Sequence, residues 1–237
     1  MIQKVLLILL LVIVLIGASL VVLFLKSMKT VKTGENTQGV YALDFRMVNS
    51  YLLKTEKGYV AIDAGLDPEK VQKELQHLGI SENEVHAVLL THSDGDHTGG
   101  IGAFPNAKIY LPELEVQMID GRTKRKLFGR ERSNSLLTPY KTVKTNESFQ
   151  IEGLDILAVP VPGHTPGSTA YVINDRYVFT GDIGIIQKGN LKVSTSIFNN
   201  DHAEAEATIT GFNSRYGDLE LIATSHGGIR RRKDESQ

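Results

Sequence analysis

The 237-residue sequence contains no cysteine. Disulfide bonds, thiolate metal ligands and a cysteine nucleophile are therefore excluded, whereas the redox compartment stays open because exported and cytoplasmic domains can both lack cysteine. A serine-elbow motif is also missing. A large charge excess is missing as well, since the formal net charge is −1. This balance disfavours a general polyanion binder, and we expect no nucleic-acid partner.

Charged residues are absent from one long stretch near the amino terminus, Val5 to Leu25. As a helix this stretch is about 30 Å long, the thickness of a bilayer core, and it predicts a transmembrane anchor over residues 5–25. A signal peptide cleaved at Gly17-Ala18-Ser19 is the alternative, although cleavage there leaves an apolar new terminus. We therefore predict a single-pass membrane protein that contacts the lipid bilayer. Lys26, Lys29 and Lys32 mildly favour a cytoplasmic domain.

The remaining chain suits one globular domain, because 41% of the sequence is hydrophobic. Residues 26–36 are polar and predict a tether, residues 37–228 predict the domain, and residues 229–237 form a basic and polar tail. Asp67 and Pro68 predict the start of a helix that Gly79 ends.

A decapeptide in the middle of the chain, Thr91-His92-Ser93-Asp94-Gly95-Asp96-His97-Thr98-Gly99-Gly100, carries four potential metal ligands within six residues. It follows the apolar run 87–90, and its glycines interrupt a helix, so we expect a loop that leaves a buried strand. A polar surface turn is the alternative, since Asp, Ser and Gly are common turn residues.

Three further residues of ligand type follow predicted strands: His164 in Gly163-His164-Thr165-Pro166-Gly167-Ser168, Asp182 after residues 177–181, and His226 after residues 221–225. Loops at one rim of a sheet would bring all seven together. Imidazole and carboxylate ligands without thiolate suit two divalent ions such as zinc, iron or manganese.

With these motifs in this order, residues 37–228 resemble the metallo-β-lactamase superfamily of glyoxalase II-like hydrolases. The resemblance implies an α/β fold, the four-layer αββα sandwich. It implies that His92, Asp94 and His164 hold a first metal, that Asp96, His97 and His226 hold a second, and that Asp182 bridges them. Asp94 departs from the family, whose common pattern has a third histidine at this place.

The resemblance implies a hydrolase in which a hydroxide between two ions, most simply zinc, cleaves an ester, thioester, lactone, amide or similar bond of a small molecule. We predict Asp96 as the catalytic residue. Asp94 adds a negative charge, which weakens the ions as Lewis acids and shifts preference toward iron or manganese. The alternatives are a diiron oxidoreductase, which carries a carboxylate at this position, and a non-catalytic metal-binding module.

Three other features have two interpretations each. Asp63 is either a carboxylate that orients a metal-bound histidine or a turn residue. His202 is either a substrate contact or a surface residue in the first turn of a helix. The basic stretch from Gly121 to Arg132 is either a solvated face or a lid that attracts anions.

Overall fold

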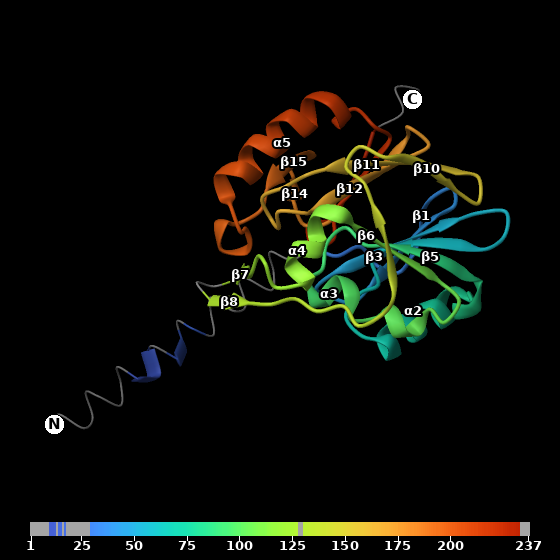
Figure 1. Cartoon of the computed structure of the whole chain (residues 1–237), viewed down its shortest axis with the longest axis horizontal. Coiled ribbons are helices and arrows are strands. Elements are labelled where there is room, and N and C mark those ends of the chain that lie inside the picture. Colours follow the sequence, from blue (N-terminus) through green and yellow to red (C-terminus); the bar gives the residue numbers. More distant parts are fainter. Residues whose placement is uncertain (1–9, 13, 16, 18–28, 128–129, 233–237) are drawn as a thin grey trace.

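The computed structural model describes residues 10–12, 14, 15, 17, 29–127 and 130–232 (Figure 1). Its first sheet has seven strands, in the spatial order β1 (Gly34–Thr37), β2 (Val40–Asp44), β3 (Asn49–Lys54), β4 (Tyr59–Ile62), β5 (Val85–Leu89), β6 (Lys108–Pro112) and β9 (Tyr140–Val143). The second sheet has six, in the order β10 (Ser148–Ile151), β11 (Leu154–Pro160), β12 (Thr169–Ile173), β13 (Tyr177–Phe179), β16 (Leu221–Ala223) and β17 (Ile229–Arg231).

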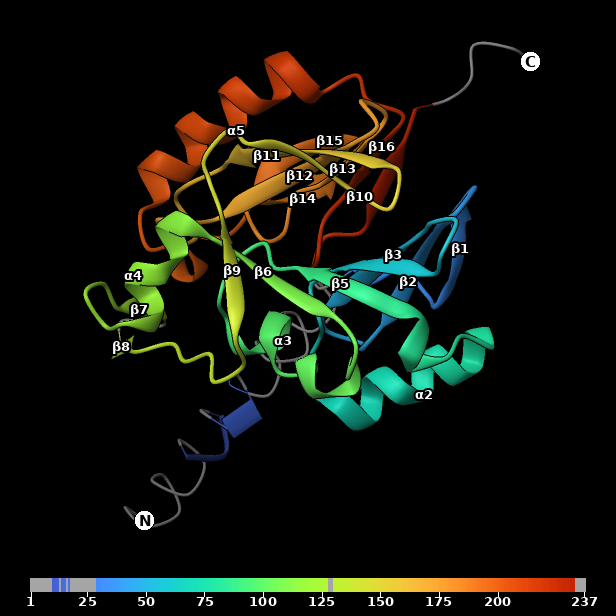
Figure 2. The same cartoon turned by 45° about the vertical axis from the view of Figure 1, so that its right-hand side comes forward.

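Between residues 29 and 232 the structure describes the α-helices α2 (Pro68–Leu78), α3 (Gly95–Thr98), α4 (Val116–Ile119) and α5 (His202–Tyr216). Short 3-10 helices lie at Glu82–Glu84, Ile101–Ala103, Glu113–Glu115 and Ser196–Phe198. Two hairpins complete the described part: β7 (Arg125–Leu127) with β8 (Arg130–Arg132), and β14 (Gly184–Gln187) with β15 (Asn190–Val193). Figure 2 shows α2 on the outer face of the first sheet and α5 on the outer face of the second. The predicted αββα sandwich is the observed architecture.

Alternating side chains hold the layers together. One apolar cluster lies between the sheets, where the rings of Tyr51 and Phe179 are 5.2 Å apart. A second cluster packs Val71 and Leu75 of α2 against the first sheet, and a third packs α5 against the second. Burial on both faces of both sheets fixes strand register, since a slip of one residue would exchange the two faces.

Local signals define the two long helices. Asp67 accepts a hydrogen bond from the Lys70 amide at the start of α2, and Gly79 ends α2 at φ 69°. Asp201 caps α5 in the same way. The start and end of α2 are the ones that the sequence predicts.

Among the residues that the structure describes, no helix is long and apolar enough to cross a membrane. A spanning helix needs about 20 consecutive apolar residues. Of the range 5–25, only residues 10–12, 14, 15 and 17 are described, and the others lie outside the described part. On this finding the predicted transmembrane helix and single-pass membrane localisation are wrong.

The sheets extend slightly beyond the predicted domain. Gly34–Thr37, within or beside the predicted tether, pairs with β2 as an edge strand. Ile229–Arg231, placed in the tail, pairs with β16. The Lys29 amide also donates to the carbonyl of His226 at 2.9 Å, so the chain before β1 contacts the loop of a candidate ligand.

Candidate metal centre

The candidate ligands lie in loops that follow four strands: β5 for the central motif, β11 for His164, β13 for Asp182 and β16 for His226. Backbone hydrogen bonds tie these segments together. The Thr169 amide at the start of β12 donates to the Thr91 carbonyl beyond β5 of the first sheet at 2.9 Å, and within the second sheet the Ser225 amide donates to the Gly181 carbonyl at 3.1 Å. The expectation that strand ends meet at one rim is therefore correct.

The central motif contains a single helical turn, α3, where the sequence predicts only loop. Glycine allows this turn to pack closely, because an added Cβ at Gly99 would lie 2.0 Å from the Leu66 carbonyl oxygen, and one at Gly100 2.0 Å from that of Ala64. The Ala64 amide donates to the His97 carbonyl at 2.7 Å. Gly99 and Gly100 thus permit the turn that presents Asp96 and His97.

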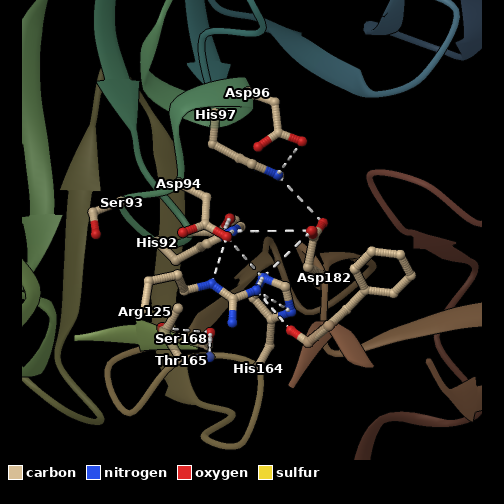
Figure 3. A network of polar contacts seen from close by, with 12 residues as sticks. His92, Ser93, Asp94, Asp96, His97, Arg125, His164, Thr165, Ser168 and Asp182 are labelled. Carbon is tan, nitrogen blue, oxygen red and sulfur yellow. Dashed lines mark hydrogen bonds and ion pairs between the residues drawn. The ribbon is translucent and has the colours of Figure 1, made fainter. Parts of the chain in front are cut away.

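Six of the seven predicted ligands form two groups whose donor atoms lie within 4.8 Å of one another: His92, His164 and Asp182, and Asp96, His97 and His226. Asp182 links them, since its Oδ2 lies 3.5 Å from His164 Nε2 and 3.0 Å from His226 Nε2. Its Oδ1 lies 3.4 Å from His97 Nε2. Figure 3 shows His92, His97 and His164 directed toward Asp182, with Asp96 beside His97.

Asp94, the seventh predicted ligand, lies beside the first group. Its Oδ2 is 3.4 Å from His164 Nε2 and 3.8 Å from His92 Nε2, and it accepts a hydrogen bond from Arg125 Nε at 2.7 Å. Its Oδ1 accepts from Asn134 Nδ2 at 3.0 Å. Although Asp94 occupies the N-cap position of α3, its side chain makes no capping bond, because these other partners hold the carboxylate.

Three imidazoles are oriented by oxygen atoms at Nδ1. Asp63 Oδ2 accepts from His97 Nδ1 at 2.8 Å, and the Met47 carbonyl accepts from His226 Nδ1. The Thr91 hydroxyl donates to Asp63 and can therefore accept from His92 Nδ1 at 3.0 Å. With the proton assigned to Nδ1 in each ring, the Nε2 lone pairs face the centre.

The electrostatics of the centre keep its carboxylates ionised and His92 neutral. Burial raises the pKa of Asp182, but His226 and His97 outweigh it and hold the pKa well below its usual range. Burial also raises the pKa of Asp96, yet His97 and a hydrogen bond from His226 lower it to about 2. Burial lowers the pKa of His92, and the neighbouring charges of His97 and His164 lower it further. Ionised carboxylates and a neutral His92 are thus available at neutral pH.

The opposite shift occurs at two histidines that face the carboxylates. Burial lowers the pKa of His97, but Asp182, Asp63 and Asp96 outweigh burial and raise it well above 6.5. Asp182 and Asp96 likewise overcome burial and raise the pKa of His226 to about 10. The carboxylates create a negative potential at the centre, which attracts protons or cations.

These residues fit metal ions, because several of the atoms that could bind a metal have no hydrogen-bond partner. Within the described residues, His92 Nε2, His97 Nε2 and Asp182 Oδ1 are buried and have no hydrogen-bond partner. Leaving such atoms unpaired costs about 1–3 kcal/mol each, and a coordinated ion would satisfy them. One nitrogen of this kind belongs to each group.

A cavity of about 300 Å³ opens onto the centre. Asp94, Asp96, His164, Asp182 and His226 line its floor, and its walls include Met47, Leu127, Arg132, Ile185 and Phe198. Leu127 and Arg132 come from the β7–β8 hairpin, within the stretch for which a solvated face and a lid were both considered. The hairpin covers one side of the cavity, which favours the lid.

Asp63 and His202 have different surroundings. Asp63 is 1% exposed and binds His97 and Thr91, as expected of a carboxylate that orients a ligand. His202 lies in the first turn of α5, where its ring contacts Asn199 at 2.9 Å and Glu206 at 3.6 Å. It is not among the residues that line the cavity, so the surface interpretation fits its position.

Sequence reasoning missed three polar residues that support the centre: Arg125, Asn134 and Glu115. Arg125 and Asn134 hold Asp94, whereas Glu115 accepts hydrogen bonds from the amide and hydroxyl of Ser93. No pattern distinguishes Arg125 from the exposed Arg130 in the same basic stretch. Their difference arises from tertiary packing.

Comparison with known proteins gives a family match, to the model of the metallo-beta-lactamase superfamily, over residues 43–209. The uncharacterized protein YobT of Bacillus subtilis is 28% identical over 63% of this chain and 67% of its own length. An atrochrysone carboxyl ACP thioesterase of Aspergillus chevalieri is 27% identical over 56% of this chain, and a probable metallo-hydrolase of Streptococcus pyogenes is 26% identical over 56%. These matches span 39% of the thioesterase and 60% of the streptococcal protein.

Solved structures show the same fold. A metallo-beta-lactamase of Cronobacter sakazakii with a HARLDQ motif has a TM-score of 0.65 at 20% identity, with 86% of this chain and 81% of that chain covered. A subclass B3 metallo-beta-lactamase of Bradyrhizobium japonicum has a TM-score of 0.65 at 17% identity, with 85% and 80% covered. Since the family model spans most of the sequence and includes the central motif, His164 and Asp182, the chain belongs to the metallo-beta-lactamase superfamily.

Proposed function

We propose that the chain is a metal-dependent hydrolase that cleaves an ester, thioester, lactone, amide or similar bond of a small molecule. The observation that carries this proposal is the convergence of imidazole Nε2 atoms and carboxylate oxygens from two groups on Asp182, at the floor of a cavity. Divalent ions bound there would polarise the scissile carbonyl and make a water molecule nucleophilic near neutral pH.

The residues of the chain have separate roles in this proposal. His92 and His164, with Asp94 beside them, would hold one ion, and Asp96, His97 and His226 the other. Asp182 would bridge the two, because its oxygens face both groups. We propose zinc as the resident metal, since each group offers two imidazole nitrogens together with carboxylate oxygens, a ligand set that zinc accepts.

Asp96 is proposed as the catalytic carboxylate. Its side chain is 32% exposed, against 9% for Asp182 and 7% for Asp94. Asp96 Oδ2 faces His226 Nε2 at 3.2 Å, which leaves Oδ1 to accept a hydrogen bond from the attacking water. Its low pKa keeps the carboxylate ionised, so it orients this water and does not donate a proton to it.

The residues of the cavity walls support a proposal for the type of substrate. Met47, Leu127, Ile185 and Phe198 supply apolar surface near the ligands, and Arg132 supplies one positive charge at the wall. We propose a substrate with a small apolar group next to the bond that is cleaved. The names of the thioesterase and metallo-hydrolase relatives support this class of reaction.

The test is a screen of the full chain, loaded separately with zinc, manganese and iron, against esters, thioesters, lactones, β-lactams and phosphodiesters. Zinc-dependent turnover of a carbonyl substrate is expected. His226→Ala should abolish turnover, whereas His202→Ala, a histidine outside the cavity, should retain it. Activity only with iron and oxygen or an electron donor would support the oxidoreductase alternative, and metal binding without turnover would support the binding module.

A further inference from the structure

Arg125 differs from the other basic residues of its segment because it is 1% exposed. Its Nε donates to Asp94 Oδ2 at 2.7 Å. The Nη atoms donate to the carbonyl of Lys126 at 2.9 Å, Asn200 Oδ1 at 2.8 Å and the carbonyl of Phe198 at 2.6 Å. These bonds fix the guanidinium in one orientation at the wall of the metal centre (Figure 3).

The guanidinium also contacts a candidate ligand. Arg125 Nη2 lies 3.0 Å from His164 Nε2 and 3.5 Å from His164 Nδ1. An atom in line with the Nε2 lone pair would be much farther from Nδ1, so Nη2 lies over the face of the ring. His164 Nε2 is consequently directed past Arg125, and the nearest carboxylate oxygens of Asp94 and Asp182 lie 3.4 and 3.5 Å from it.

The contacts of Asp94 resemble those of a ligand held in position. Asn134 and Arg125 each bind one of its oxygens, while Oδ2 faces the Nε2 atoms of His92 and His164. Ligand atoms on a tetrahedral zinc ion at about 2.0 Å are separated by roughly 3.3 Å. The separations of Asp94 Oδ2 from these nitrogens, 3.4 and 3.8 Å, are close to that spacing.

We propose that Asp94 and Arg125 act as a pair in place of one neutral histidine, with Asp94 as oxygen donor to the first group and Arg125 as the positioning residue that holds and neutralises it. The carboxylate removes one positive charge from the centre, and the guanidinium returns it. The centre therefore has the net charge that a histidine at position 94 would produce. This inference rests on the proposed function and extends it to how the first ion is held.

A role for Arg125 in binding the substrate fits the geometry less well. Its Nε and Nη donors are directed to groups of the protein, and the side chain is almost completely buried. Arg132 is exposed and also lines the cavity. It is thus the better placed of the two to meet an anionic group of a substrate.

The proposal predicts that the two residues can be exchanged only together. In Asp94→His, a neutral ligand stands beside an unpaired guanidinium, whose charge repels the first ion. Adding Arg125→Met removes that charge and keeps most of the side-chain volume. Histidine at position 94 should therefore function in the double variant and not in the single variant, although histidine is the usual family ligand.

The experiment measures zinc stoichiometry and affinity of the full chain by chelator competition and elemental analysis, with circular dichroism as the test of folding. Wild type should bind two equivalents. Asp94→His should bind its first-group ion at least about tenfold more weakly and keep the second. Asp94→His/Arg125→Met should regain the first ion, whereas the matched control Asp94→His/Arg130→Met, which removes an exposed arginine of the same hairpin, should not.

Two results would overturn the pair: Asp94→His binding both ions as wild type does, or the Arg125→Met double variant binding no better than Asp94→His. One equivalent in wild type, unchanged in Asp94→Ala, would also overturn it while leaving the second group as a metal site. No zinc in wild type would instead overturn the proposed function. If Asp94→His does not fold, Asp94→Asn is compared with Asp94→Asn/Arg125→Met in the same way. The corresponding two results would then overturn the pair.

Discussion

Asp63 offers a test of how the chain prepares a histidine for metal binding. Its carboxylate accepts from the Thr91 amide at 2.7 Å, from the Thr91 hydroxyl at 2.8 Å and from His97 Nδ1 at 2.8 Å. Two substitutions separate its effect on stability from its effect on the ligand. Asp63→Ala removes all three acceptor contacts, whereas Asp63→Asn retains the shape of the side chain.

In Asp63→Ala, the Thr91 hydroxyl can donate to His92 Nδ1, which lies 3.0 Å away, once the His92 proton has moved from Nδ1 to Nε2. The Thr91 amide and His97 Nδ1 remain without an acceptor. At about 1–3 kcal/mol for each buried unpaired donor, the variant should lose about 2–6 kcal/mol of unfolding free energy. This is a large part of the typical stability of a domain, roughly 5–15 kcal/mol.

In Asp63→Asn, the amide oxygen can still accept from the Thr91 amide, but the amide nitrogen then faces His97 Nδ1. This arrangement places the His97 proton on Nε2, the atom that must ligate the metal. Zinc affinity of the second group should fall about 10- to 100-fold with little loss of stability. Chelator competition and thermal unfolding measure the two effects, and Asp175→Asn in an exposed turn is the control. Unchanged zinc affinity in Asp63→Asn would refute this reasoning.

Three further predictions concern stability. Gly181→Ala should cost at least about 2 kcal/mol, because φ is 56° and the new Cβ would lie 2.6 Å from Thr91 Oγ1. Gly211→Ala in α5 should stabilise the protein by about 0.5–1 kcal/mol, since nothing lies within 4 Å of the new Cβ. Chemical denaturation measures the unfolding free energy of both variants, and a Gly181→Ala protein more stable than Gly211→Ala would contradict the reasoning. Burial raises the pKa of Glu115 to about 6 despite hydrogen bonds from Ser93 and Thr165. As the pH rises from 4.5 through 6, the unfolding free energy of wild type should therefore fall by about 2 kcal/mol relative to that of Glu115→Gln. Parallel pH profiles of unfolding free energy for the two proteins would contradict this.

The sign of the Glu115 effect follows from proton binding. A folded-state pKa above the unfolded value means that the folded chain binds the extra proton, so this contribution is present at low pH and is lost as the pH rises through the folded pKa. Comparison with the glutamine variant cancels the titration of the other groups.

The rim of the centre could be predicted because each ligand follows an apolar strand. His164, Asp182 and His226 lie just beyond β11, β13 and β16, and the central motif lies just beyond β5. Strand direction in a sheet then brings distant parts of the sequence together. The fold class followed from the family resemblance that these motifs carry.

Other features depend on tertiary contacts that no local pattern contains. Arg125 and Arg130 occupy the same basic hairpin, yet one is buried against Asp94 and the other is exposed. Charge composition predicts a solvated face for both, and only the position of β7 over the cavity distinguishes them. The short helix α3 was missed because Gly99 and Gly100, taken as helix breakers, serve to bring this turn close to the backbone of residues 64–66.

The apolar run at residues 5–25 shows the limit of hydropathy as a predictor. An uncharged run of this length predicts a spanning helix from sequence. Within the described part of the chain, no helix meets the requirement.

The central claim is that the two groups of imidazole and carboxylate ligands hold metal ions. Elemental analysis of the full chain after zinc loading and gel filtration tests it most directly. Two equivalents of zinc per chain are expected, one for each group, with one equivalent retained when His226→Ala disables the second group. A folded wild-type chain that retains no zinc, manganese or iron would contradict the claim.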